Sequence, residues 1–168
     1  MATSFAQELY QGVKDGGASF ACYLPDSRLY GTEVLLEQDP DIRTVVCARE
    51  DEGIAIAVGA GLAGELPVAL MEASGVGYSG LILARARSQR GPLVVVFSHV
   101  RALGERFDYH AASRETGEGV LTGLHIPYVV VRSVDEARET VIHAMQTAEG
   151  QRTVVGIGIP GRLLGEVT

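Results

Sequence analysis

Six short apolar runs, spread along the whole chain, constrain its fold more than any other feature. Each run is a near-continuous series of hydrophobic residues and does not alternate hydrophobic with polar positions. The runs occupy residues 19–24, 43–48, 67–73, 92–98, 127–131 and 153–159. Because strands of this kind need cover on both faces, the pattern is typical of a parallel sheet between two layers of helices.

The segments between the runs predict the covering helices. Phe5, Leu9 and Val13 share one helical face, and Asp15-Gly16-Gly17 ends that helix. Residues 101–119 are polar, and we expect them to be irregular. Further helices are expected at 30–37, 51–62, 77–87, 119–124 and 134–146. The alternation predicts an α/β, doubly wound fold with a six-stranded, mainly parallel sheet and helices on both faces. We find no linker and expect residues 1–168 to form a single domain.

Composition excludes two classes of partner. The formal net charge is -7 and the chain contains one lysine, Lys14. A nucleic-acid backbone rewards clustered positive charge, and so does an anionic membrane surface, so we expect neither partner. The longest apolar stretch, 53–64, has 12 residues. It is too short to span a hydrocarbon layer of roughly 30 Å. Because the first residues also lack the apolar core of a secretory signal, we expect a cytoplasmic protein.

The cysteines and histidines show no metal-binding pattern. Cys22 and Cys47 lie inside apolar runs, where a free cysteine behaves as a small hydrophobic residue. The four histidines are scattered, and no pair of cysteines has the spacing of a zinc site. We therefore predict two buried free thiols and no metal held by this chain.

Ligands of doubly wound folds bind outside the carboxyl ends of the strands. The pattern GxGxxG, which occurs from Gly59, Gly75 and Gly156, offers one reading of that edge. The occurrence at Gly75 follows a strand and precedes a helix, as a dinucleotide site requires. However, the next strand ends in Ser98-His99 and supplies no acid for a ribose. A Rossmann-like nucleotide-binding module therefore stays an alternative and not the main interpretation.

Glu50, Asp51 and Glu52 follow the second run directly and open a helix. One interpretation makes all three acids partners of the helix dipole. The other separates Glu50, whose carboxyl lies between the end of a strand and the start of a helix among glycine and alanine residues. A partly desolvated carboxyl there is able to exchange a proton with a ligand. Spacing alone leaves both interpretations open.

Residues 48–79, AREDEGIAIAVGAGLAGELPVALMEASGVGYS, resemble the pyrimidine-binding (PYR) domain of thiamine-diphosphate enzymes. The resemblance is greatest to the α subunits of sulfopyruvate decarboxylase and to phosphonopyruvate decarboxylase. An acid nine residues before a helical glycine, here Glu50 and Gly59, is one shared element. The turn at 25–27, the loop at 70–78 and the final strand with Pro160-Gly161 are the others. The resemblance covers nearly the whole chain.

The resemblance implies a catalytic role for Glu50 and a shared cofactor site. In the family, the acid hydrogen-bonds N1′ of the aminopyrimidine of thiamine diphosphate, and the cofactor acts as the electron sink for decarboxylation of a 2-oxo acid. Ser74, Gly75, Val76 and Gly77 would form the loop against the pyrimidine. The family binds the diphosphate and Mg²⁺ with a Gly-Asp-Gly motif on a PP domain, and this sequence has none. We therefore expect a PP-domain (β) partner subunit, with self-association inside a hetero-oligomer.

The resemblance implies further site residues. Asp26 and Ser27 would handle protons after the first strand, although a plain Asx turn explains Asp26 equally well. His110 would face the substrate from a loop, or lie on the surface. The resemblance also implies that three residues contact the substrate, namely Glu72, His99 and Arg101.

The departures leave the substrate open. Glu72-Ala73 replaces Gln-Asn, Tyr78 replaces Asn, and Val100-Arg101 replaces Arg-Gly. Because a sulfonate or phosphonate dianion favours arginine in a defined geometry, a less anionic 2-oxo acid is an equal candidate. They also leave open a non-catalytic PYR-like regulatory or scaffold subunit.

Overall fold

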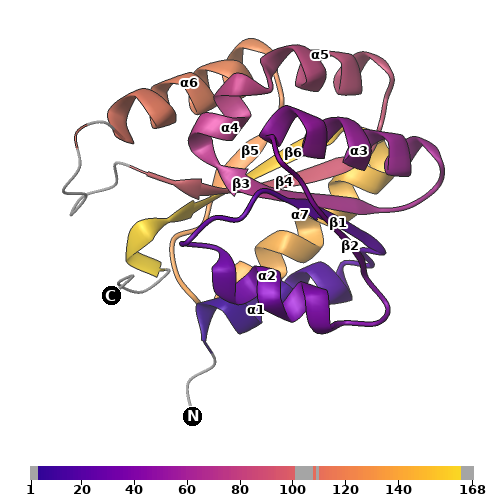
Figure 1. Ribbon diagram of the computed structural model, residues 1–168, viewed down its shortest axis with the longest axis vertical. Helices are drawn as coiled ribbons and strands as arrows, with labels where there is room; N and C mark the ends of the chain where they lie inside the picture. Colours follow the sequence, from indigo (N-terminus) through magenta and orange to yellow (C-terminus); the bar gives the residue numbers. More distant parts are fainter. Residues whose placement is uncertain (1–3, 101–107, 109, 164–168) are drawn as a thin grey trace.

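The structure is a computed structural model that describes residues 4–100, 108 and 110–163 (Figure 1). Its centre is a sheet of six strands, and every neighbouring pair is parallel. The strands lie in the order β2-β1-β3-β4-β6-β5. Their bounds are β1 Phe20–Tyr23, β2 Arg43–Val46, β3 Pro67–Glu72, β4 Leu93–His99, β5 Tyr128–Val130 and β6 Val154–Pro160. The α/β prediction is therefore confirmed, and the sheet is wholly parallel.

Helices cover both faces of this sheet (Figure 1). One face carries α1 (Phe5–Asp15), α2 (Tyr30–Gln38) and α7 (Ala137–Gln151). The other face carries α3 (Glu50–Leu62), α4 (Ala73–Tyr78), α5 (Gly80–Ser88) and α6 (His110–Gly123). A short 3₁₀ helix, η1 (Gly161–Leu163), follows β6. None of the helices in the described part of the chain is long and apolar enough to cross a bilayer.

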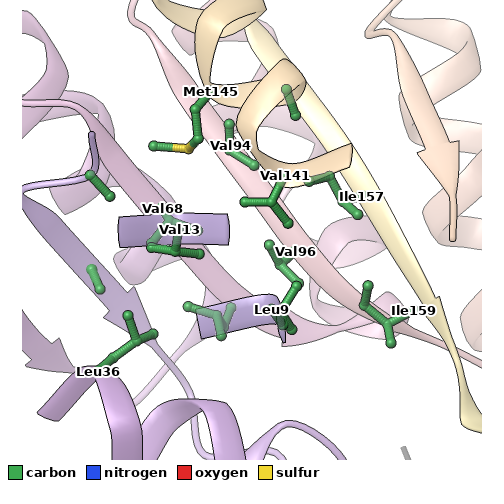
Figure 2. Packing of buried hydrophobic residues seen from close by; sticks show 14 of the residues in the cluster. Leu9, Val13, Leu36, Val68, Val94, Val96, Val141, Met145, Ile157 and Ile159 are labelled. Atoms are coloured by element: carbon green, nitrogen blue, oxygen red, sulfur yellow. The ribbon is translucent and has the colours of Figure 1, made fainter. Parts of the chain in front are cut away.

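Strand β4 shows why continuous apolar runs form this sheet. All seven of its residues are buried. Val94 and Val96 join the cluster beneath α1 and α7, where Figure 2 shows them beside Leu9 and Val141. Val95 and Phe97 point to the opposite cluster, beneath α3 to α6. A strand with helices on both sides has no face on which polar residues would be favourable.

The helices differ from the sequence prediction at several places. Residues 110–123 form one helix, α6, where we expected an irregular segment up to residue 119. The stretch 73–88 forms two helices, α4 and α5, and not a loop followed by a helix. Helix α7 begins three residues later and ends five residues later than the expected range of 134–146. Glycine is frequent in α4 and α6, and tertiary packing outweighs its poor helix propensity there.

The topology determines where a ligand site can form. From β1 the chain moves outward to β2 and then returns to β3 on the other side of β1. The order therefore reverses between β1 and β3, which is the usual place for a crevice in a parallel sheet. Glu50 follows β2, and Ser74 follows β3. Both residues consequently lie at the carboxyl edge near this reversal.

Candidate active site

The start of α3 separates three consecutive acids by their contacts. Asp51 forms a double hydrogen bond with the guanidinium of Arg49, with Nε–Oδ1 at 3.0 Å and Nη2–Oδ2 at 3.1 Å. The bond from Arg49 holds the pKa of Asp51 below its ordinary value. Glu52 accepts a hydrogen bond from the backbone N–H of Ala48 at 3.1 Å, which closes the first turn. Asp51 and Glu52 are thus committed to local structure.

Glu50 has no such commitment. Its side chain is half-buried and makes no hydrogen bond or ion pair with any other residue of the described ranges. Position 75 on α4 determines where the side chain lies, because a Cβ there would come within 2.3 Å of Glu50 Cγ and 3.1 Å of Cδ. Gly75 therefore allows the carboxyl-bearing side chain to lie directly against the backbone of α4.

An open cleft of about 390 Å³ lies beside this contact. Arg49, Glu50, Ser74 and Tyr78 line it. The guanidinium of Arg49 lies over the ring of Tyr78, 5.0 Å from its centroid, and also donates a hydrogen bond to the tyrosine hydroxyl. This pair joins the start of α3 to the end of α4 across one side of the cleft. The cleft therefore holds one half-buried carboxylate, one hydroxyl group from Ser74, and a wall formed by a cation stacked on an aromatic ring.

The expected pyrimidine loop, residues 74–77, is divided between this cleft and the interior. Ser74 lines the cleft, and Gly75 lies against the side chain of Glu50. Val76 is fully buried and belongs to the core cluster beneath α3 to α6. At Gly77, a Cβ would lie 2.7 Å from Thr116 Oγ1, so this glycine serves the packing of α4 on α6. Our expectation that residues 74–77 form a loop is wrong, since they lie within a helix whose inner side faces the core.

The turn after β1 is held by a buried carboxyl. Asp26 Oδ1 accepts a hydrogen bond from the N–H of Arg28 at 2.9 Å, which is an Asx turn. Glu33 Oε1 accepts the N–H of Asp26 at 3.1 Å. Glu33 is 2% exposed, and burial raises its pKa to about 7. Asp26 Oδ2 is buried and has no hydrogen-bond partner in the part of the chain that the structure describes, whereas Ser27 is exposed.

The end of β4 carries a second polar group. His99 is 5% exposed, and its Nε2 lies 2.7 Å from Glu118 Oε1 on α6. Arg114 Nε donates to the other oxygen of Glu118 at 3.2 Å. Glu72 ends β3 and pairs in register with Ser98, so it is one strand away from His99. His110 is the first residue of α6 and not a loop residue, and Arg101 lies outside the described residues.

Of the residues expected at the site, Glu50 and Ser74 line the cleft and Gly75 lies against Glu50, whereas Arg49, Glu33 and Glu118 were not predicted. Arg49 directly precedes Glu50, and an arginine two residues before an aspartate, Asp51, could have indicated the ion pair that holds it at the cleft. Glu33 and Glu118 gave no signal, because each lies on a helix face that is buried only by tertiary packing. The two cysteines are free and buried, as predicted.

Comparisons with known proteins place this geometry in context. The α subunit of sulfopyruvate decarboxylase from Methanothermobacter thermautotrophicus is 35% identical over 143 residues, which are 84% of this chain and 86% of the relative. The same subunit from Methanococcus maripaludis is 27% identical over 153 residues, covering 90% of this chain and 92% of the relative. No protein-family model matches the chain.

Solved structures share the fold. A 2-oxoglutarate:ferredoxin oxidoreductase from Magnetococcus marinus matches with a TM-score of 0.75 and 19% identity, over 96% of this chain and 29% of that one. A thiamine diphosphate-dependent 4-hydroxybenzoylformate decarboxylase from Rhodococcus jostii RHA1 matches with a TM-score of 0.72 and 18% identity, over 97% and 31%. The chain thus spans less than a third of each.

The six-stranded parallel sheet, with its carboxyl-edge cleft at the β1–β3 reversal, is the fold of the PYR domain of thiamine-diphosphate enzymes. Within that class, the chain belongs to the family of sulfopyruvate decarboxylase α subunits. The resemblance seen in residues 48–79 is therefore confirmed.

Proposed function

We propose that this chain is the α subunit of a two-chain, thiamine-diphosphate-dependent 2-oxo acid decarboxylase. Membership of the family supports decarboxylation and a partner subunit. The single observation that carries the role of Glu50 is the contrast at the start of α3. Asp51 and Glu52 are bound to neighbouring groups, whereas the half-buried carboxyl of Glu50 lines the cleft without a partner among the described residues.

The residues of the cleft fit one end of the proposed cofactor. A half-buried carboxyl without a partner is suited to hydrogen-bond the ring nitrogen of an aminopyrimidine, and Gly75 keeps space for the Glu50 side chain. Thiamine diphosphate supplies the electron sink for loss of CO₂ from a 2-oxo acid. Glu50 would hold and share a proton at N1′, and Ser74 would line the same side. Diphosphate and Mg²⁺ would be held mainly by the partner's PP domain.

The substrate class is a 2-oxo acid. Sulfopyruvate is one candidate, because the relatives carry that name. The one arginine lining the cleft, Arg49, is already bound by Asp51 and Tyr78, so it offers a substrate dianion less than a free guanidinium would. We therefore keep less anionic 2-oxo acids as equal candidates.

The first experiment tests assembly and reaction together. The chain is co-expressed with a candidate subunit that carries Gly-Asp-Gly and a downstream Asn. The purified complex is then supplied with thiamine diphosphate, Mg²⁺ and either sulfopyruvate, phosphonopyruvate or pyruvate. We expect CO₂ release from at least one acid. A stable complex that binds the cofactor but decarboxylates none of the three would overturn the proposed reaction.

A second experiment tests Glu50 itself. Glu50→Gln keeps the size of the side chain but cannot share a proton in the same way, so we expect turnover of the complex to fall about 10²–10⁴-fold. Glu52→Gln is the matched control, because its carboxyl closes the helix turn and does not line the cleft. Asp51→Asn is less clean, since Asp51 holds Arg49. Equal losses in Glu50→Gln and Glu52→Gln would make Glu50 an ordinary helix-dipole partner.

A further inference from the structure

Three hydrogen-bonded side chains, His99, Glu118 and Arg114, form a polar group at the end of β4, here called the relay. His99 Nε2 and Glu118 Oε1 are 2.7 Å apart, and Arg114 holds the second oxygen of the same carboxyl at 3.2 Å. Burial acts to raise the pKa of Glu118, but the hydrogen bonds from His99 and Arg114 outweigh it and keep this pKa below its ordinary value. Glu118 is consequently an ionised, acceptor-only group near neutral pH.

An acceptor-only carboxylate determines which ring nitrogen carries hydrogen. The short Nε2–Oε1 contact is a hydrogen bond only if Nε2 is the donor. In the neutral ring, Nδ1 then keeps its lone pair. Nδ1 is buried and has no hydrogen-bond partner within the described ranges. A buried polar atom left without a partner costs free energy, and a catalytic role is one of the explanations for such an atom in a folded protein.

Packing fixes this relay relative to the Glu50 cleft. His99 and Phe97 share one face of β4, and their ring centroids are 6.1 Å apart. That face is covered by α4 and α6, whose backbones approach closely: a Cβ at Gly117 would lie 2.6 Å from the carbonyl oxygen of Ala73. Gly117 directly precedes Glu118, and Ala73 directly precedes Ser74 of the cleft. The carboxylate that holds His99 is therefore anchored to the same helix that lines the cleft.

We infer that Glu118, held by Arg114, is a positioning residue that keeps His99 as its Nε2–H tautomer and reserves Nδ1 to accept a hydrogen bond from the hydroxyl group that the carbonyl oxygen of the 2-oxo acid becomes when it takes up a proton during the reaction. The carboxylate holds one ring nitrogen, and the Phe97 ring lies beside the imidazole on the same sheet face. The role in the reaction rests on the proposed function, whereas the tautomer does not.

The experiment uses the full chain, labelled with ¹⁵N in its histidine rings. Ring nitrogen chemical shifts at pH 7.5 distinguish the two neutral tautomers and the doubly protonated ring. We expect His99 to be the Nε2–H tautomer. In Glu118→Gln, the amide is able to donate or accept, so we expect a mixture of tautomers with an unchanged fold. Glu118→Asp, which keeps the charge, should restore much of the Nε2–H form.

A matched control comes from the surface of α7. Glu139 lies 4.0 Å from His143 as an exposed pair, so Glu139→Gln removes the same charge from beside a histidine without touching the relay. We expect it to leave the His99 signals unchanged. In the assembled enzyme, Glu118→Gln should lower kcat/KM about ten- to a hundredfold, while Glu139→Gln keeps the value of the unmodified protein.

The outcomes separate this inference from the proposed function. A His99 ring that is Nδ1–H or doubly protonated, or one that Glu118→Gln does not alter, overturns the tautomer assignment. An altered tautomer with normal kcat/KM overturns the positioning role in the reaction. If Glu50→Gln retains normal decarboxylation, the proposed function fails, and the tautomer result stands independently of it.

Discussion

Single residues at the cleft are constrained by what lies opposite them. Gly75 is the clearest case, because its missing Cβ is what allows Glu50 to lie against α4. In Gly75→Ala, a Cβ would come within 2.3 Å of Glu50 Cγ and 2.9 Å of Glu50 Cβ, and Glu50 would have to move. We expect turnover of the assembled enzyme to fall at least tenfold, with a loss of unfolding free energy of about 1–2 kcal/mol. Steady-state kinetics and urea unfolding measure the two effects.

Gly59 on α3 provides the control for that substitution. A Cβ there meets no atom within 4 Å. Gly59→Ala should therefore raise the unfolding free energy by about 0.5–1 kcal/mol through helix propensity and leave turnover unchanged. Normal turnover in Gly75→Ala would show that the position of the Glu50 side chain does not matter for catalysis.

Glu33 gives the turn after β1 a dependence on pH. Its pKa is about 7 in the folded chain against an ordinary value of 4.5, so the folded state binds more protons between these two values. Below pH 4.5, Glu33 is protonated in the folded and the unfolded state and does not lower stability. As the pH rises from 4.5 to about 7, the free energy of unfolding falls by about 3 kcal/mol in total.

Substitution with the neutral isostere should remove that loss. Glu33→Gln can still accept the N–H of Asp26. We expect it to be more stable than the unmodified protein at pH 8, by up to about 3 kcal/mol, and nearly equal to it at pH 4.5. Urea unfolding at both pH values measures the difference, with the exposed Glu139→Gln as the control. The same difference at both pH values would contradict a buried, proton-binding Glu33.

Residue identities predicted the site only in part. Glu50 stood out because it follows an apolar run, and the resemblance in residues 48–79 implied a catalytic role for it, which stays a prediction. The contact that isolates it from Asp51 and Glu52 joins α3 to α4, and no spacing within one element reveals such a contact. Val76 shows the same limit, since its position in a glycine-containing stretch indicated a loop, whereas α4 turns it into the core.

At the scale of elements, α4 and α6 are joined by glycines that appear interchangeable in sequence. A Cβ added at Gly117 would lie 2.6 Å from the carbonyl oxygen of Ala73. A Cβ added at Gly119, two residues later on the same helix, would meet no atom within 4 Å. Because a backbone oxygen cannot rotate away, Gly117→Ala should lower the unfolding free energy by about 1–3 kcal/mol. Gly119→Ala should raise it by about 0.5–1 kcal/mol. Urea unfolding of both variants tests the pair, and changes of equal sign would contradict the packing.

Strands were more predictable than helices in this chain for a physical reason. A strand buried on both faces is apolar along its length, as β6 is throughout and as β3 and β4 are up to their carboxyl ends, where Glu72 and Ser98-His99 follow the apolar residues. A helix needs one apolar stripe, and α6 supplies little of it, with Leu121 fully buried and Gly117 buried against α4. Its formation depends on close approach of two backbones, which an apolar periodicity does not record.

At the scale of the whole molecule, charge indicates what the cleft cannot bind. The chain has a formal net charge of -7, and its one lysine, Lys14, is engaged 2.7 Å from Asp39 on the α1 side of the sheet. Of the residues that line the cleft, Arg49 is the cation, and Asp51 already neutralises it. A diphosphate needs several donors or a bound cation. The side chains lining the cleft therefore suit the uncharged aminopyrimidine ring of thiamine diphosphate and not its anionic diphosphate.

This asymmetry predicts how the full cofactor binds. Titration calorimetry of the purified chain with thiamine diphosphate and Mg²⁺ should show at most weak binding, because the diphosphate would lack its ligands. Addition of the proposed PP-domain subunit should produce tight binding that is lost when Mg²⁺ is chelated. Glu50→Gln should weaken binding in the complex far less than chelation does, since it alters one hydrogen bond at the ring and leaves the diphosphate ligands intact. Tight, Mg²⁺-dependent binding by the chain alone would mean that it contains its own diphosphate site, and the division of the cofactor between two subunits would be wrong.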